Sequence, residues 1–471
     1  MPTTLLRHAD LLVTMDADRQ VIPDGGIFAT DGMIQTVGPT AELPDEADHV
    51  IEASGMVVLP GLINTHHHLY QTLTRALPAV QDVELFDWLR NLYRVWGELT
   101  GEAVHVSTKL GLAELLLSGC TTVSDLFYVF PDGSDVSIDI EINAARELGV
   151  RFHPGRGSMS RGKSQGGLPP DEVVQTEEAI LYDSERLIHT YHEPAPGGMV
   201  RIDLAPCSPF SVSRKGMEAT RDLGRREAVR LHTHLAETLD EERYCLKTYG
   251  MRPVALMEEL GWLGPDVWFA HMVHVNEAEI AQLAETGTGV AHCPSSNMRL
   301  GSGIAPIVPM LEAGVPVSLA VDGSASNDSS HMLAEARQAL LLQRVRYGAG
   351  ALSVTQVLEL ATLGGARILG RDDIGALAPG KAADLIGVHR DRLEYAGAQH
   401  DPIGALLLCA PAWVDLAMVQ GEVRVWNGAI PGLDLPALIA RHNTLAAELV
   451  ARAEERYGQP LCERVWRKAC S

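Results

Sequence analysis

The sequence predicts an α/β protein, a (β/α)8 barrel with a small β-sandwich built from both chain ends. Three observations lead to this prediction. From Val57 onward the 471-residue chain alternates apolar strand, polar loop and amphipathic helix. Eight such units of roughly 37 residues fit a barrel, which takes ~250 residues or more. Short strands with turns precede this region and return after it, and 46% of the residues are hydrophobic, enough for a large core.

The predicted organisation has four segments. Residues 1–58 give the N-terminal part of the sandwich, and residues 59–369 form the barrel. Residues 370–430 return to turns and short strands and complete the sandwich, and residues 431–471 form a helical tail. The barrel strands are predicted to end near His68, Asp125, Pro154, Pro206, His234, His271, Cys293 and Asp322.

Composition and charge limit the partners of the chain. A formal net charge of −23 repels phosphate backbones, which argues against a nucleic-acid partner. No apolar run approaches the roughly 18–20 residues of a membrane span, and no leader-like stretch begins the sequence. Seven scattered cysteines without a Cys-x-x-Cys pair indicate free thiols in a reducing compartment. We therefore expect a cytoplasmic homo-oligomer that acts on a small molecule.

Histidines follow the first predicted barrel strand. Residues 60–68 form an apolar strand that ends in His66, His67 and His68. Alternate residues of a strand share a face, so His66 and His68 point the same way while His67 points oppositely. Two imidazoles on one face can bind one metal ion. The alternative is a group of solvated loop histidines, and His67 is interpreted as structural.

A third imidazole is expected from residues 231–237. His234 lies near the end of this predicted strand, and Glu237 follows where the strand gives way to its loop. A carboxylic acid there can carry protons beside a metal without binding it. The alternative is a lone strand histidine and a surface glutamate that begins a helix. His232 shares a face with His234 and is given a supporting role.

Asp322 and His271 complete the candidate site. Residues 317–321 are a continuous apolar run, as in buried parallel strands, and they deliver Asp322 to the end of the strand. A buried carboxylate is costly unless it meets a cation. His271 ends the run 267–271 in the same way. Taken alone, each could be a buried residue satisfied by hydrogen bonds.

The four motifs lie on strands 1, 5, 6 and 8 of a barrel whose active sites lie at the carboxyl ends of the strands. We therefore predict one metal ion held by His66, His68, His234 and Asp322. Three imidazoles and a carboxylate suit Zn²⁺, with Fe²⁺ as the alternative, and they leave a position open for water. The predicted catalytic residues are Glu237, His271 and Asp322.

At this point the residues resemble the amidohydrolase superfamily, in particular its branch of cytosine, guanine and S-adenosylhomocysteine deaminases and triazine hydrolases. The resemblance covers nearly the whole chain. It is carried by Pro60-Gly61 with His66 and His68, by His234 with Glu237, by His271, by His292-Cys293-Pro294 with Asn297, by Asp322, and by Gly380-Lys381 with Ala383-Asp384-Leu385. It implies the barrel-plus-sandwich fold and a metal-activated water.

The resemblance also implies residue roles. His66, His68 and His234 would be zinc ligands, and Asp322 would be both ligand and base. Glu237 would be a proton shuttle, and His271 would orient or deprotonate the water. These roles agree with those argued from the residues themselves.

Within the branch, three stretches are similar to 8-oxoguanine deaminases, namely residues 68–76 with 84–89, residues 156–160 with 166–170, and residues 322–328. This implies hydrolysis of a free purine base, 8-oxoguanine, to uric acid and ammonia. Gln71 could offer its amide to a purine edge. Trp88 could cap the ring by stacking. The alternatives are a solvated helix residue for Gln71 and a packing anchor for Trp88.

One departure from guanine deaminases concerns the segment after strand 4. Guanine deaminases carry an Arg-Phe pair there, whereas this chain has residues 206–210, Pro-Cys-Ser-Pro-Phe. Guanine binding by that route is therefore not expected. Cys207 could line the pocket or be a small buried thiol. Arg156, after strand 3, is the candidate for a substitute cation.

Three other functions stay open. Deamination of guanine or isocytosine and hydrolysis of a chloro- or alkylamino-s-triazine would use the same metal site, so only the pocket separates them. A non-catalytic zinc protein is the remaining alternative. Glu237 and His271 argue against it, because a closed structural site uses four protein ligands and needs no extra acid or base.

Overall fold

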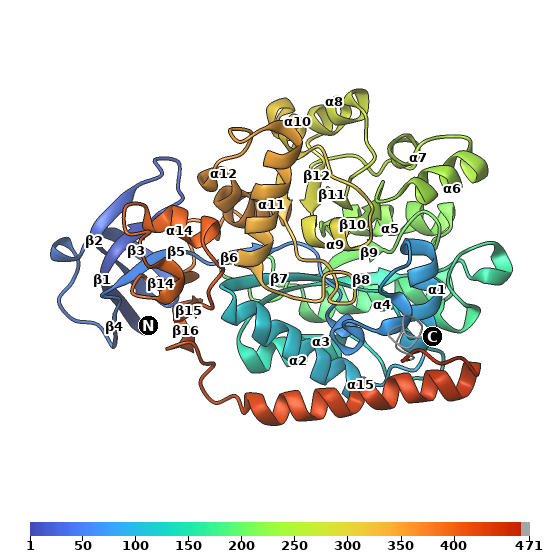
Figure 1. Cartoon of the computed structure of the whole chain (residues 1–471), viewed down its shortest axis with the longest axis horizontal. Coiled ribbons are helices and arrows are strands. Elements are labelled where there is room, and N and C mark those ends of the chain that lie inside the picture. Colours follow the sequence, from blue (N-terminus) through green and yellow to red (C-terminus); the bar gives the residue numbers. More distant parts are fainter. Residues whose placement is uncertain (463–471) are drawn as a thin grey trace, which may run out of the picture.

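The computed structural model describes residues 1–462 and confirms the predicted fold class. Figure 1 shows a barrel wrapped in helices, with a separate sheet beside it and a long helix along its lower edge. The barrel places the candidate site at the carboxyl ends of its strands. The predicted segment boundaries stay predictions, and residues 463–471 of the predicted tail lie outside the described residues.

Eight parallel strands form the barrel in the order of the sequence, from β6 to β13. They are β6 (Leu62–Asn64), β7 (Cys120–Phe127), β8 (Arg151–Ser158), β9 (Asp203–Pro206), β10 (Leu231–Leu235), β11 (Val267–His271), β12 (Gly289–His292) and β13 (Val317–Leu319). Every residue of these strands except His234 is buried, which explains their apolar runs. The largest differences from the predicted ends are at β6, which stops at Asn64, before the histidines, at β8, which continues to Ser158, and at β13, which stops at Leu319, before Asp322.

Hydrogen bonds join the first and last barrel strands where the ligands lie. The Thr65 hydroxyl lies 2.7 Å from the Ser318 hydroxyl. Val321 N donates to Asn64 Oδ1 over 2.9 Å, and Asp322 N donates to His66 O over 3.1 Å. Closing the barrel thus brings residues about 250 positions apart in sequence into one site.

The helices surround the barrel and extend from it. They are α1 (Leu85–Trp96), α2 (Gly101–Leu117), α3 (Ile138–Leu148), α4 (Glu177–Tyr191), α5 (Arg214–Arg226), α6 (Leu239–Tyr249), α7 (Pro253–Glu259), α8 (Glu277–Thr286), α9 (Pro294–Arg299), α10 (Ile307–Ala313), α11 (Met332–Tyr347), α12 (Val354–Glu359), α13 (Gly365–Ile368), α14 (Pro402–Leu408) and α15 (Leu435–Tyr457). Helix α15 packs against α1 and α2. Within residues 1–462, no helix is both long and apolar enough to cross a membrane.

The second sheet joins both chain ends. Its strands are β1 (Thr3–Val13), β2 (Val21–Thr30), β3 (Met33–Pro39), β4 (His49–Glu52), β5 (Met56–Pro60), β14 (Leu385–His389), β15 (Leu416–Val419) and β16 (Glu422–Trp426). Strands β5 and β14 pair antiparallel, with Pro60 opposite Leu385. Leu12, Val58, Leu385 and Met418 share one core, so the blue and orange strands of Figure 1 form a single unit.

A buried ion pair connects this sheet to the barrel. Arg151, on β8, donates from Nε to Asp384 Oδ2 over 2.8 Å and from one terminal nitrogen to Asp384 Oδ1 over 3.0 Å. The same guanidinium also donates to Gln420 Oε1 over 2.7 Å. Both members of the pair are almost fully buried, at 0% and 3% side-chain exposure. Asp384 belongs to the Gly380–Leu385 motif, which therefore has a structural function here.

Asp384→Asn is expected to destabilise the fold by about 3–5 kcal/mol, because it leaves a buried guanidinium without its counter-charge. Denaturant unfolding followed by circular dichroism measures the change. The matched control is Asp87→Asn, which breaks an exposed pair with Arg90 and should leave stability unchanged. Equal stability of the two variants would contradict the bridging role of Arg151.

Candidate metal centre and active site

Four side chains converge at the carboxyl end of the barrel. One donor atom each from His66, His68, His234 and Asp322 lies within 4.8 Å of the others, and the side chains are buried. His66 and His68 follow β6, His234 lies on β10, and Asp322 follows β13. These are the four ligands expected from the sequence.

Hydrogen bonds fix the tautomer of His66. His232 Nδ1 lies 3.0 Å from the Trp268 carbonyl oxygen and must donate to it, so His232 Nε2 is an acceptor. His66 Nδ1, at 2.8 Å from His232 Nε2, then carries a proton, and His66 Nε2 presents a lone pair. That buried Nε2 has no hydrogen-bond partner among the described residues. His232 therefore supports the site by orienting His66.

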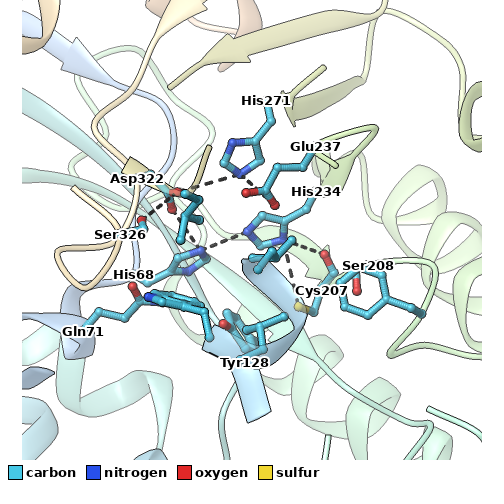
Figure 2. Close-up of a pocket in the computed structure, with 15 residues that line it drawn as sticks. His68, Gln71, Tyr128, Cys207, Ser208, His234, Glu237, His271, Asp322 and Ser326 are labelled. Atoms are coloured by element: carbon cyan, nitrogen blue, oxygen red, sulfur yellow. Dashed lines mark hydrogen bonds and ion pairs between the residues drawn. The ribbon is translucent and has the colours of Figure 1, made fainter. Parts of the chain in front are cut away.

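His68 and His234 are oriented in the same way. His68 Nδ1 donates to Leu126 O, and His234 Nδ1 donates to Cys207 O, each over 2.6 Å. Their Nε2 atoms lie only 3.0 Å apart (Figure 2), although both present lone pairs. Burial lowers the pKa of each of these imidazoles, which favours the neutral form that binds metals. Facing lone pairs in a buried site fit a divalent cation.

The two carboxylate oxygens of Asp322 have different neighbours. Oδ1 lies 3.3 Å from His66 Nε2 and 3.4 Å from His68 Nε2, on the side of the ligand cluster. Oδ2 accepts from Ser326 Oγ over 3.1 Å and lies 3.8 Å from His271 Nε2. Burial raises the pKa of Asp322, but the close approach of His66 and the neighbouring imidazoles His271 and His68 outweighs it and holds the pKa well below its usual range. The carboxylate can bind a metal with one oxygen and accept a proton with the other.

Glu237 and His271 face this carboxylate (Figure 2). Glu237 Oε2 lies 3.7 Å from His271 Nε2. Burial raises the pKa of Glu237 to about 7, while His271 opposes the shift. Burial lowers the pKa of His271, but Glu237 and Asp322 together leave it above its ordinary value. Glu237 can thus gain and lose a proton near neutral pH.

The backbone is strained at two of these residues. His271 has φ 75° and Asp322 has φ 64°, in the left-handed region that non-glycine residues rarely adopt. Such a conformation costs about 1–3 kcal/mol and persists where surrounding contacts enforce it. Both residues stand at strand ends and turn their side chains toward the same point. The candidate site is therefore one of the places where the backbone is strained.

A pocket with about 390 Å³ of atom-free space, open solvent included, adjoins the ligands. Gln71 and Trp88 both line it. A Cβ at position 323 would lie 2.0 Å from Gln71 Oε1, so Gly323 leaves room for the amide. Trp88 Nε1 donates to Ala325 O over 3.3 Å, so Trp88 is anchored by packing and also borders the cavity.

Cys207 also lines the cavity. Burial raises the pKa of its thiol to about 12, so it is not a thiolate near neutral pH. Its carbonyl oxygen accepts from His234 Nδ1 and orients that ligand. Because this contact uses the backbone carbonyl, which every residue has, the residue type at position 207 does not predict it.

Arg156 is not among the residues that line this cavity. Strand β8 continues past it, and its Nε donates to Asp183 Oδ2 on α4 over 2.7 Å. One terminal nitrogen donates to Gln175 Oε1 over 2.8 Å, and the guanidinium lies 4.1 Å from the Phe130 ring centre. These contacts hold the guanidinium against α4 and its neighbouring loop. The sequence analysis expected Arg156 at the substrate, and the structure corrects this placement.

Sequence reasoning missed several residues of the cavity. Tyr128 and Ser208 each follow a barrel strand by one or two residues, a position that could have identified them. Ser326 donates to the Asp322 carboxylate. The apolar wall consists of Leu85, Leu89, Phe210 and Leu300. The first three lie in the segments 84–89 and 206–210 named above, but an apolar residue type does not by itself distinguish a pocket wall from the core.

Comparison with known proteins gives consistent matches. The amidohydrolase family model matches residues 57–423. The chain is 54% identical to an 8-oxoguanine deaminase from Pseudomonas aeruginosa, over 91% of this chain and 95% of that protein. It is 37% identical to an isoxanthopterin deaminase from an unknown prokaryotic organism, over 95% and 98% of the two chains.

Solved structures agree. An atrazine chlorohydrolase from Arthrobacter aurescens, complexed with zinc, superposes with a TM-score of 0.90 at 36% identity and covers 94% of this chain and 100% of its own. The family model alone spans more than half of the sequence, and it includes all four ligand positions. The chain therefore belongs to the amidohydrolase family.

Proposed function

We propose that this protein is a zinc-dependent hydrolytic deaminase of a free purine base, converting 8-oxoguanine and water to uric acid and ammonia. The observation that carries the reaction type is the placement of His271 Nε2 at 3.7 Å from Glu237 Oε2 and 3.8 Å from Asp322 Oδ2. The 8-oxoguanine deaminase at 54% identity supports the choice of substrate.

His66, His68, His234 and Asp322 would hold the zinc ion, which lowers the pKa of a water and so prepares a nucleophile. One proton of the attacking water passes to the pair formed by Asp322 Oδ2 and His271 Nε2, as the water oxygen bonds to the purine carbon that bears the amine. Glu237 donates a proton to the adjacent ring nitrogen. The amine takes the proton held by Asp322 and His271, the carbon–nitrogen bond breaks, and ammonia leaves. Glu237 regains its proton from the new hydroxyl group, which becomes a carbonyl.

The residues that line the cavity can contact both the faces and the polar edges of a flat ring. Gln71 would pair its amide with a polar edge of the purine, and Trp88 would border the ring. Cys207 would lie against the ring as a neutral thiol. Tyr128, which lies at 5.1 Å from His68 between ring centres, closes the side next to the metal ligands.

The alternative is a related heterocycle. A hydroxydechloroatrazine ethylaminohydrolase from Pseudomonas is 37% identical to this chain, over 98% and 97% of the two chains. This supports an s-triazine as the second candidate, because the metal site and the acid would be unchanged. Guanine and isocytosine, which also carry a ring-bound amine, are the remaining candidate substrates.

A substrate panel tests the proposal. Zinc-loaded protein is expected to release ammonia and uric acid from 8-oxoguanine with a kcat/KM at least tenfold above those for guanine, isocytosine, isoxanthopterin and a hydroxytriazine. Ammonia is followed by a coupled assay, and uric acid by chromatography. If the protein converts other compounds of the panel but not 8-oxoguanine, the assignment of 8-oxoguanine as substrate is wrong. If it converts none of the five compounds, the proposed deaminase activity is wrong.

We also propose a cytoplasmic homo-oligomer without a nucleic-acid partner. The net charge of −23 supports the last point. Light scattering after size exclusion measures the assembly, and a single-chain mass would contradict it.

A further inference from the structure

Asn297 holds the nitrogen of His271 that faces away from the site. Asn297 Oδ1 lies 2.9 Å from His271 Nδ1, and both side chains are buried. A carbonyl oxygen accepts only, so Nδ1 carries a proton. His271 Nε2 is then the nitrogen that faces Glu237 and Asp322, at 3.7 and 3.8 Å.

Asn297 is itself firmly placed. It lies on α9, whose Ser295 N donates to Glu335 Oε1 over 2.9 Å. Asn297 N donates to Cys293 O over 3.0 Å, and Ser302 N donates to Asn297 O over 2.9 Å. The amide is thus delivered to His271 by a helix fixed at both ends.

The other half of the amide has no partner. Asn297 Nδ2 is buried, and no atom of residues 1–462 accepts a hydrogen bond from it. An unpaired buried donor is unfavourable, and a leucine of similar volume would avoid it. The amide is therefore not explained by packing, and its remaining contact is the one to His271.

We propose that Asn297 is a positioning residue that fixes the tautomer of His271 with the proton on Nδ1. The proposal rests on the deaminase function above. A carbonyl acceptor suits both states of the imidazole, because Nδ1 donates to it whether or not Nε2 holds a proton. His271 can then accept the proton of the attacking water at Nε2 without any rearrangement at Nδ1. A neutral amide does this without adding another buried carboxylate to Glu237, Glu241 and Asp322.

The test compares two buried amides with one hydrogen bond each. Asn297→Leu is expected to lower kcat by about 10- to 100-fold, the usual cost of removing a group that orients a histidine at a metal site. KM and zinc content should stay near wild type. The matched control is Gln343→Leu: Gln343 Nε2 donates to Ala305 O over 3.1 Å, and its Oε1 has no partner within the described part of the chain. This variant should keep its kcat.

Asn297→Asp is the second variant, because a carboxylate oxygen can accept the same Nδ1 proton. Its kcat should exceed that of Asn297→Leu by at least threefold. The proposal is overturned if Asn297→Leu has the kcat of Gln343→Leu, if it loses zinc, or if Asn297→Asp is no better than Asn297→Leu. Activity is measured on whichever heterocycle the wild-type protein deaminates best. A wild-type protein that deaminates none would instead contradict the proposed function.

Discussion

Glu237→Gln is expected to lower kcat by about 10²- to 10⁴-fold, the usual contribution of a general acid or base. Glutamine keeps the shape of the side chain but cannot exchange a proton. Glu237 lies 5% exposed beside His271, where burial raises its pKa to about 7. Zinc content should not change, because Glu237 is not among the four clustered donors. Steady-state kinetics and metal analysis of one preparation give both numbers.

The control for this variant is Glu178→Gln, which makes the same change on the surface of α4. It should match the wild-type protein in kcat, KM and zinc content. Full activity of Glu237→Gln would remove Glu237 from the mechanism. Loss of zinc in that variant would instead make Glu237 part of the metal site.

His68→Ala is expected to abolish turnover and to reduce bound zinc from one ion per chain to almost none. The variant removes one of the three imidazole donors and leaves His234 Nε2 without its neighbour at 3.0 Å. Metal at ~100 times its Kd adds about 2.7 kcal/mol to stability, so the thermal midpoint should fall as well. Chelation of the wild-type protein should give the same losses, and added zinc should reverse them. Metal analysis and differential scanning fluorimetry are the measurements.

A second cluster in the described chain provides the control. Glu185, His189 and Glu227 also bring three donor atoms within 4.8 Å of one another, but His189 is exposed. His189→Ala should therefore keep one zinc per chain and full activity. Retention of zinc by His68→Ala together with its loss from His189→Ala would place the metal on the surface and contradict the barrel site.

The sequence predicted the ligands because each stands at a place that local pattern defines. An apolar run followed by a polar residue marks the end of a buried strand, and four such ends carry His or Asp. His66 and His68 lie among the clustered donors although β6 ends at Asn64, before both of them. His67 turns away from the cluster, and its Nε2 lies 2.9 Å from Ser330 Oγ.

Arg156 shows where such reasoning stops. Its position after a strand was inferred from an end near Pro154, but β8 continues to Ser158. This difference of four residues places Arg156 within the strand, where it reaches Asp183 on α4. Strand ends read from one sequence carry errors of this size. The direction of the Arg156 side chain depends on its partner Asp183, which lies on α4 and cannot be identified from the sequence around Arg156.

The sequence by itself determined the barrel, the donor set and the presence of an acid and a base beside it, since these follow from residue type and strand order. Only the tertiary structure decided which nitrogen of each histidine faces the metal site. That choice depends on Trp268 O, Leu126 O, Cys207 O and Asn297 Oδ1. Three of these are backbone atoms that every residue has, and all four become neighbours only when the barrel closes.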